Sequence, residues 1–365
     1  MTPRLELREL HKRFEDVVAV RALSMKLQKG EFVSLLGPSG CGKSTTLAMI
    51  AGFETPTTGE ILVDGTVVNH VPPQRRRIGL VFQDYAVFSR MTVRANLSFG
   101  LEARRIPADE RRKRVAAMAE KLQLSHVLER RGHNLNMSEM QRVALGRVLL
   151  TEPELILLDE PMSNLDAVFR ANLRSELKQI QRDLAQTVLY VTHDQAEAMS
   201  MSDRIAIMRA GEVQQIGTPD EIYDHPRNRF VAEFIGDPPI NILAGEISIE
   251  GGKAVASTAR QRGIVLGRGP AAAGRCLLAI RPHDIRVSHA PATDSTPASV
   301  RFVENLGAEH VLHLDYAGDM LRAVTAPGFA AEDDTVHLSL PGDQIHLIDR
   351  ASEEVVPLAR GESGQ

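Results

Sequence analysis

The sequence contains no tryptophan and only two cysteines, Cys41 and Cys276. Two cysteines so far apart exclude a disulfide scaffold and lack the spacing of a metal site. The 12 histidines are scattered and never form a pattern such as HExxH, so no zinc site is expected. We interpret both cysteines as reduced thiols.

Long hydrophobic runs and an excess of one charge are also missing. No run approaches the roughly 18 apolar residues that cross a bilayer, and the first residues, MTPRLELREL, carry acids where a signal peptide has its apolar core. Lys+Arg 43 against Asp+Glu 47 leaves no basic excess, and the block QRRRIG at 74–79 is short. We therefore expect a cytoplasmic protein with no nucleic-acid partner.

The chain of 365 residues is long enough for two domains. Up to about residue 235, strand-like runs such as EFVSLLG, LILLDE and TVLYVTH alternate with helical stretches, which predicts an α/β domain with a largely parallel sheet. Within it, residues of about 87–150 read as a helical subdomain. From 236 to 358 short strand-like runs predict an all-β domain, and 359–365 read as a flexible tail.

The segment GPSGCGKST follows an apolar strand and precedes a helix, the context of a phosphate-binding P-loop. Its backbone N–H groups and the helix N-terminus are suited to hold nucleotide phosphates. Lys43 should reach the β- and γ-phosphates, and Ser44 should ligate Mg²⁺. The predicted nucleotide-binding residues of the loop are Gly37, Pro38, Ser39, Gly40, Cys41, Gly42, Lys43, Ser44 and Thr45. Because Cys41 lies near a helix N-terminus, we expect a favoured thiolate whose alkylation inactivates the protein unless ATP protects it.

A second element, LILLDE at 155–160, is an apolar strand that ends in two acids. Asp159 would hold Mg²⁺ through water, and Glu160 would polarise the water that attacks the γ-phosphate. Alone, a strand ending in acids is weak evidence, but beside a P-loop it predicts an ATPase.

These motifs resemble those of the ATP-binding cassette ATPases, over residues of about 4–235. The resemblance implies that Phe14 stacks on adenine, that Gln83 of the Q-loop contacts Mg²⁺ and the attacking water, and that His193 is the switch histidine. It places Ser163, Asn164, Leu165 and Asp166 in the D-loop. Three of these residues also have a purely structural explanation. Phe14 could be a core residue, Gln83 a polar group at a strand end, and His193 a surface histidine.

The runs VPPQRRRIGLVFQDYAVFSRMTVRANLSFGL and RNRFVAEFIGDPPINIL, followed by AIRPHDI, resemble bacterial carbohydrate-importer ATPases of the maltose and glycerol-phosphate type. That resemblance covers nearly the whole chain and implies an OB-like regulatory domain at the C-terminus. It also implies transmembrane permease subunits as partners, indirect coupling to a solute-binding protein, and a peripheral position on the cytoplasmic face of the inner membrane. A cargo such as polyamine, iron or an anion, or a soluble ATPase role without a permease, remain alternatives.

Aligned outward from MQRVALGR, residues 135–139 stand where the family has its signature LSGGQ, which faces the ATP of the opposite subunit. The chain has Leu135, Asn136, Met137, Ser138 and Glu139 there. Asn136 with Glu139 three residues later predicts a capping box that preserves the helix start. A carboxylate about 8 Å from a γ-phosphate, however, costs roughly 2 kcal/mol at an effective dielectric near 20.

The motifs of this chain's own site are complete, whereas its signature is degenerate. We therefore hypothesise an asymmetric pair with a second ATPase subunit that supplies an intact signature. A homodimer that tolerates the degenerate signature at a low rate is the alternative.

Overall fold

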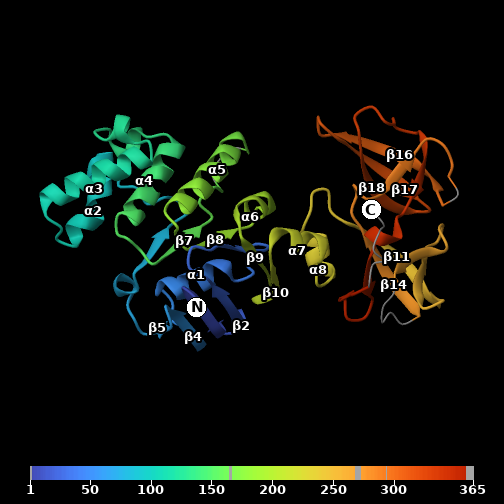
Figure 1. Ribbon diagram of the computed structural model, residues 1–365, viewed down its shortest axis with the longest axis horizontal. Coiled ribbons are helices and arrows are strands. Elements are labelled where there is room, and N and C mark those ends of the chain that lie inside the picture. Colours follow the sequence, from blue (N-terminus) through green and yellow to red (C-terminus); the bar gives the residue numbers. More distant parts are fainter. Residues whose placement is uncertain (1, 164–166, 268–272, 293, 359–365) are drawn as a thin grey trace. The chain divides into compact units, whose positions relative to one another are not determined.

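The computed structural model describes residues 2–163, 167–267, 273–292 and 294–358. Its contacts divide the chain into two compact units, Met1–Pro219 and Asp220–Gln365. Each unit is described by itself (Figure 1).

The first unit is built on a six-stranded sheet in the order β10-β9-β3-β8-β7-β6. Neighbouring strands are parallel except for β10, which pairs antiparallel with β9. Its strands are β3 (Phe32–Leu36), β6 (Ile78–Val81), β7 (Leu155–Asp159), β8 (Val188–Thr192), β9 (Arg204–Arg209) and β10 (Glu212–Gly217). All five residues of β3 and of β8 are buried, as expected for central parallel strands covered on both faces. The predicted α/β architecture is confirmed.

A second, antiparallel sheet of this unit has the order β2-β1-β4-β5. It consists of β1 (Leu5–Phe14), β2 (Val17–Leu27), β4 (Thr58–Val63) and β5 (Thr66–Val67). Helix α1 (Lys43–Ala51) lies between the two sheets, because its Leu47, Met49 and Ile50 share one core with Leu5 of β1 and Leu35 of β3. The helix that follows the P-loop is therefore held from both sides.

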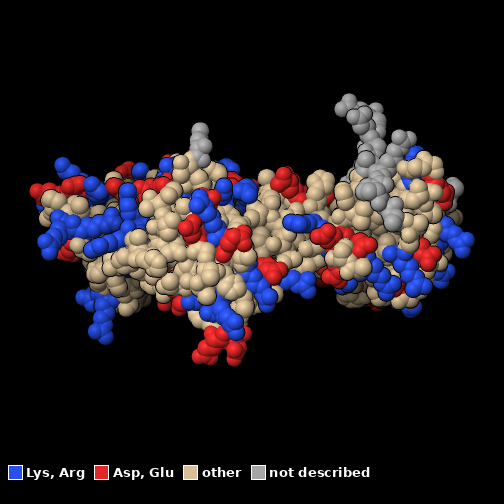
Figure 2. Space-filling view, turned by 90° about the horizontal axis from the view of Figure 1, so that it is seen from below, with Lys and Arg blue, Asp and Glu red and all other residues tan. Residues whose placement is uncertain are grey.

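The opposite face of the parallel sheet is covered by α5 (Ala167–Asp183) and α6 (Gln195–Met201) (Figure 1). Beside them lies the predicted helical subdomain, formed by α2 (Val93–Ala103), α3 (Ala108–Lys121) and α4 (Met137–Leu149). On the face that Figure 2 shows, basic and acidic side chains are interspersed. In the described ranges, no helix is both long and apolar enough to cross a membrane.

The second unit contains the short helices α7 (Pro219–Asp224) and α8 (Arg229–Phe234) and two antiparallel sheets, in the orders β13-β12-β11-β14-β20-β21 and β15-β19-β16-β17-β18. Residues from both sheets form one core, including Leu278, Val300 and Leu314. The strands are β11 (Asn241–Glu250), β12 (Lys253–Ser257), β13 (Ile264–Gly267), β14 (Gly274–Ile280), β15 (Arg286–Ser288), β16 (Thr296–Asn305), β17 (His310–Tyr316), β18 (Asp319–Thr325), β19 (Thr335–Ser339), β20 (His346–Asp349) and β21 (Val355–Val356). The predicted β-rich C-terminal fold is confirmed.

The boundary between the compact units falls after Pro219, the first residue of α7, and so earlier than the 235/236 junction expected from the sequence. Buried Arg281 explains this, because its guanidinium donates to the carbonyls of Tyr223 at 3.0 Å and Ala232 at 3.2 Å, and to that of Ile235. These bonds attach α7 and α8 to the β-rich unit. Residues 359–365, read as a flexible tail, lie outside the described residues.

Candidate nucleotide site

The P-loop joins β3 to α1 and closes around the Lys43 ammonium. Gly42 has a φ of 102°, and a Cβ there would lie 2.3 Å from the Ala19 carbonyl oxygen, so only glycine fits. Lys43 is 5% exposed, and its Nζ donates to the carbonyl oxygens of Gly37 at 2.8 Å and Pro38 at 3.1 Å. The loop therefore holds its cation at the position where nucleotide phosphates are bound in such loops.

Ser44 and Asp159 meet at the carboxyl edge of the parallel sheet. The Ser44 Oγ lies 3.4 Å from Asp159 Oδ1. Burial, followed by the charge of neighbouring Glu160, raises the pKa of Asp159, whereas the Ser44 hydroxyl and the Lys43 charge lower it. One hydroxyl and one carboxylate beside bound phosphates fit the way proteins hold Mg²⁺. Among the described residues there is no cluster of three or more His, Cys, Asp or Glu side chains that could form an all-protein metal cage.

Glu160 and His193 form the second pair of the site. Oε2 of Glu160 lies 3.1 Å from Nδ1 of His193, whose side chain is 51% exposed. The Glu160 amide donates to the carbonyl of Val191 at 3.0 Å, which joins the ends of β7 and β8. Glu160 has a φ of 44°, in the left-handed region that non-glycine residues seldom adopt. The fold thus holds the Glu160 carboxylate beside the His193 imidazole, with the Glu160 backbone in an uncommon left-handed conformation.

Gln83 is exposed and bonds to the D-loop. Its Nε2 donates to Ser163 Oγ at 3.0 Å, and that hydroxyl donates to the carbonyl of Glu160 at 3.0 Å. The structure therefore connects the Q-loop to Glu160 through the Ser163 hydroxyl. The other predicted D-loop residues, Asn164, Leu165 and Asp166, lie outside the described residues.

Phe14 stands at the end of β1 with 40% of its surface exposed, so it is not a core residue. The Lys12 ammonium lies 4.5 Å from its ring centroid. An exposed ring of this kind can stack on a base, and a stacking contact discriminates poorly between bases.

The segment Leu135–Glu139 begins α4 with the predicted capping box. Asn136 Oδ1 accepts from the Glu139 amide at 2.9 Å, and Glu139 Oε2 accepts from the Asn136 amide at 2.9 Å. Glu139 is only 9% exposed, and both of its oxygens lie 3.3 Å from Arg130 Nη1. The carboxylate is turned into the helix start and Arg130 compensates its charge, so we expect a weaker repulsion of an opposing phosphate than the sequence alone suggests. Met137 and Ser138 still replace the two glycines of the signature.

The burial of Cys41 argues against the expectation of a reactive thiolate. Cys41 is 3% exposed, and burial raises the pKa of its thiol despite the nearby Lys43. Helix N-termini activate thiols only where the charged form stays solvated or paired. Burial, with the charge of Glu246 as a smaller cause, likewise raises the pKa of Cys276 to about 11.

We expect both thiols of the native chain to react with an aromatic disulfide reagent at pH 8 at least about tenfold more slowly than free cysteine, because reaction needs the thiolate. Colour release in native buffer and in guanidinium measures this. A Cys276→Ser variant isolates Cys41. Rapid labelling of Cys41 in that native variant, blocked by ATP, would contradict the burial and support the expectation drawn from the sequence.

Pattern reasoning missed four buried polar residues behind the site: Tyr85, Tyr190, Thr192 and Glu197. The spacing of Asp194 and Glu197 suggests a helix start, but no pattern indicates that the Glu197 side chain turns inward. Only the folded structure shows that the Glu197 carboxylate is buried.

The chain matches two family models: the ABC transporter model over residues 20–163 and the TOBE domain model over residues 278–348. It is 44% identical to a xylose/arabinose import ATP-binding protein of Haloferax volcanii, over 94% of this chain and 93% of that protein. It is 40% identical to an sn-glycerol-3-phosphate import ATP-binding protein of Rhizobium johnstonii, over 94% and 93% of the two chains. A spermidine/putrescine import ATP-binding protein of Acidothermus cellulolyticus is 45% identical, over 95% and 92%.

Among solved structures, CbiO1 of Clostridium perfringens, titled as part of an ABC transporter complex, matches with a TM-score of 0.57 and 31% identity. The match covers 61% of this chain and 91% of that one. These likenesses agree with the P-loop, the adjacent acids and the paired histidine at one sheet edge. The chain belongs to the ATP-binding proteins of ABC transporters, and it is an ATPase.

Proposed function

We propose that this ATPase energises the uptake of a sugar, polyol or glycerol-type solute through a membrane permease, from the cytoplasmic face of the inner membrane. The observation that carries the proposal is the meeting of Lys43, Ser44, Asp159, Glu160 and His193 at the carboxyl edge of one parallel sheet. The named cargoes of the sugar and glycerol-phosphate relatives support the solute class. A solute-binding protein would deliver the cargo to the permease.

The residues of the site divide the chemistry of phosphoryl transfer among them. The P-loop amides and Lys43 hold the phosphates, and Phe14 offers a face to the adenine. Glu160 orients and polarises the attacking water, while His193, held at 3.1 Å from Glu160, donates toward the γ-phosphate oxygens. Mg²⁺ at Ser44 and Asp159, with Gln83 as a further ligand, would neutralise phosphate charge when bound.

We propose that a groove between the helical subdomain and the sheet receives one helix of the permease. Its volume is about 220 Å³, and its lining includes Leu80, Phe82, Phe99 and Val148. Phe82 and Phe99 are 44% and 46% exposed, which is unusual for two large apolar side chains beside one cavity. An amphipathic helix with an apolar face is the partner that such a groove recognises.

Phe99→Ser should abolish co-purification of the chain with its permease from detergent-solubilised membranes, because it removes apolar surface from the groove. ATP binding by the variant should stay within about twofold of wild type, since Phe99 lies outside the nucleotide site. Phe302→Ser is the matched control, an exposed phenylalanine at 50% on β16 of the other unit. Unchanged recovery of permease with Phe99→Ser would contradict the docking surface.

We also propose that the active assembly pairs this chain with a second ATPase subunit whose signature is intact. This chain carries its own P-loop, Glu160 and His193, whereas Met137 and Ser138 remove the close backbone approach that glycines permit. The compensated charge of Glu139 makes the missing glycines the main defect. Glu139→Gln should therefore change turnover by less than about twofold.

The experiment for the proposed function purifies the permease complex and compares ATPase rates of this chain alone, the second subunit alone and the mixture. A homodimer of this chain that turns over as fast as the mixture would overturn the asymmetric pair. Uptake into vesicles is then measured with labelled arabinose, glycerol phosphate and spermidine. Transport of spermidine alone would overturn the solute class and leave the ATPase assignment intact.

A further inference from the structure

A buried carboxylate lies directly behind the site. Glu197 is 2% exposed, and its Oε2 accepts from the Tyr190 hydroxyl at 2.6 Å and from Thr192 Oγ1 at 2.7 Å. Tyr190 and Thr192 are themselves 0% and 2% exposed. Burial raises the pKa of Glu197, and the two hydroxyl donors oppose that shift. A carboxylate is costly at such a depth, so a residue kept there needs a reason beyond packing.

Glu197 occupies the helix position at which a glutamate ordinarily completes a capping box, as Glu139 does in α4. Asp194 caps α6 by accepting from the Glu197 amide at 3.0 Å. The Asp194 amide, however, donates to Thr192 Oγ1 at 2.9 Å and not to the Glu197 carboxylate. Because Thr192 satisfies that amide, the Glu197 side chain is released to point into the protein.

His193 stands between two residues that this arrangement fixes. Thr192 is held by Glu197, and Asp194 is held by the Thr192 hydroxyl and by Arg170 Nη1 at 2.8 Å. The imidazole itself is half exposed and touches Glu160. The anchored residues on either side therefore set where the imidazole lies.

The same cluster reaches the other catalytic loops. Tyr85, two residues after Gln83, is 4% exposed and donates to the carbonyl of Pro161, next to Glu160, at 2.7 Å. Burial, followed by the negative charge of Glu197, raises the pKa of Tyr85 to about 12. Tyr85 thus joins the segments that carry Gln83 and Glu160.

We propose that Glu197 is a positioning residue for hydrolysis, which holds the Thr192–Asp194 segment so that His193 meets Glu160. This inference rests on the ATPase activity of the chain. Glu197 touches no substrate and acts through His193. Its removal should therefore lower turnover without weakening ATP binding.

A double-mutant cycle on the full-length chain in its permease complex tests the inference. Glu197→Ala should lower kcat by roughly 100-fold with KM for ATP within about twofold, and Glu197→Gln, whose amide oxygen still accepts from the hydroxyls, should recover most of that loss. In a His193→Ala background, Glu197→Ala should change kcat by less than about twofold. Independent, additive losses would overturn the proposal, because they would mean that Glu197 does not act through His193.

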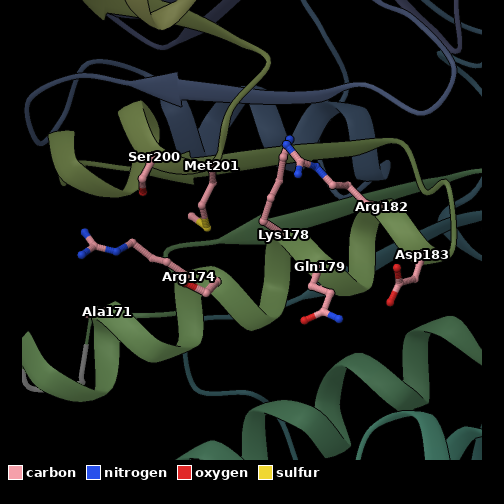
Figure 3. Close-up of a pocket in the computed structure, with 9 residues that line it drawn as sticks. Ala171, Arg174, Lys178, Gln179, Arg182, Asp183, Ser200 and Met201 are labelled. Carbon is pink, nitrogen blue, oxygen red and sulfur yellow. The ribbon is translucent and has the colours of Figure 1, made fainter.

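Ser200→Ala is the matched control on the same helix. Ser200 faces a groove of about 620 Å³ between α5 and α6, where Figure 3 shows it with Arg174 and Lys178. Its hydroxyl bonds within α6, to the carbonyl of Ala196 at 2.6 Å. Turnover of this variant should equal wild type. A loss equal to that of Glu197→Ala would show that any disturbance of α6 suffices, which would overturn the specific role.

Tyr190→Phe keeps the test decisive if Glu197→Ala folds poorly, and crystal structures add a readout other than activity. Tyr190→Phe keeps the ring against Phe32, at a centroid distance of 5.7 Å, and removes only one donor to Glu197. It should lower kcat about fivefold with unchanged KM. Crystal structures should show His193 displaced from Glu160 in Glu197→Ala and in place in Glu197→Gln. A His193 that stays beside Glu160 in Glu197→Ala would overturn the proposal, whether or not the wild-type chain is active. An inactive wild-type chain would instead refute the ATPase assignment.

Discussion

Glu160→Gln is expected to lower ATP turnover by about 10² to 10³-fold while ATP binding stays within about threefold of wild type. Glutamine keeps the size of the side chain and its contact with His193 but cannot accept a proton from the attacking water. Because the residues expected to hold the phosphates lie in the P-loop and are unchanged in this variant, the loss should fall on kcat. Rates of phosphate release and equilibrium binding of a fluorescent ATP analogue measure the two effects.

The control for this substitution is Glu152→Gln, in a turn before β7. Glu152 is 76% exposed and pairs with Arg114 at 2.9 Å on the surface. Its substitution should leave turnover within about twofold, as exposed ion pairs contribute little. Turnover of Glu160→Gln within twofold of wild type would contradict the role of Glu160 and move the search for the base to another group.

Arg76→Met should lower the free energy of unfolding by about 3 to 5 kcal/mol, the largest stability loss that we expect from one substitution in the first unit. Arg76 is 4% exposed and donates to four carbonyls: Val71 at 2.7 Å, Met49 at 2.6 Å, Ile50 at 2.8 Å and Asn69 at 3.1 Å. Two of these end α1, the helix that begins at Lys43. Methionine fills the space but removes the guanidinium donor from all four carbonyls, of which only that of Met49 is also known to accept from a backbone amide, that of Gly52 at 3.2 Å.

Urea unfolding followed by circular dichroism measures the loss. Arg77→Met is the adjacent control: the Arg77 side chain is 68% exposed and its ion pair with Glu154 at 2.8 Å lies on the surface. It should cost less than about 1 kcal/mol. Equal losses in the two variants would show that the charge, and not the bonds to the end of α1, determines the stability.

The sequence predicted the parallel strands of the first unit because fully buried strands such as β3 and β8 are predominantly apolar runs. It did not predict that the first strand-like run leaves this sheet and pairs antiparallel with β2 and β4. Periodicity reports which faces are buried, whereas strand partners depend on contacts between distant segments. The basic block QRRRIG shows the same limit, since its Arg76 is buried and structural.

The chemistry-bearing residues of the site were predictable because phosphate binding needs glycines, a lysine and a hydroxyl at fixed spacing. The structure places Lys43 and Ser44 beside Asp159 and Glu160, as the P-loop and the strand ending in two acids predict, and His193 beside Glu160, as the family resemblance implies. The burial of Cys41, the contact of Glu139 with Arg130 and the inward turn of the Glu197 side chain were not predictable. Each depends on how the chain packs in three dimensions, which a local pattern does not contain.

The left-handed backbone of Glu160 has a consequence for the evolution of this chain. A non-glycine residue at a φ of 44° carries about 1 to 3 kcal/mol of strain, which the surrounding sheet must support. Glycine at this position would relax the strain and abolish the activity in one step. Selection for thermal tolerance alone would therefore favour a robust but inert descendant, and only selection for growth on the imported solute would retain the carboxylate.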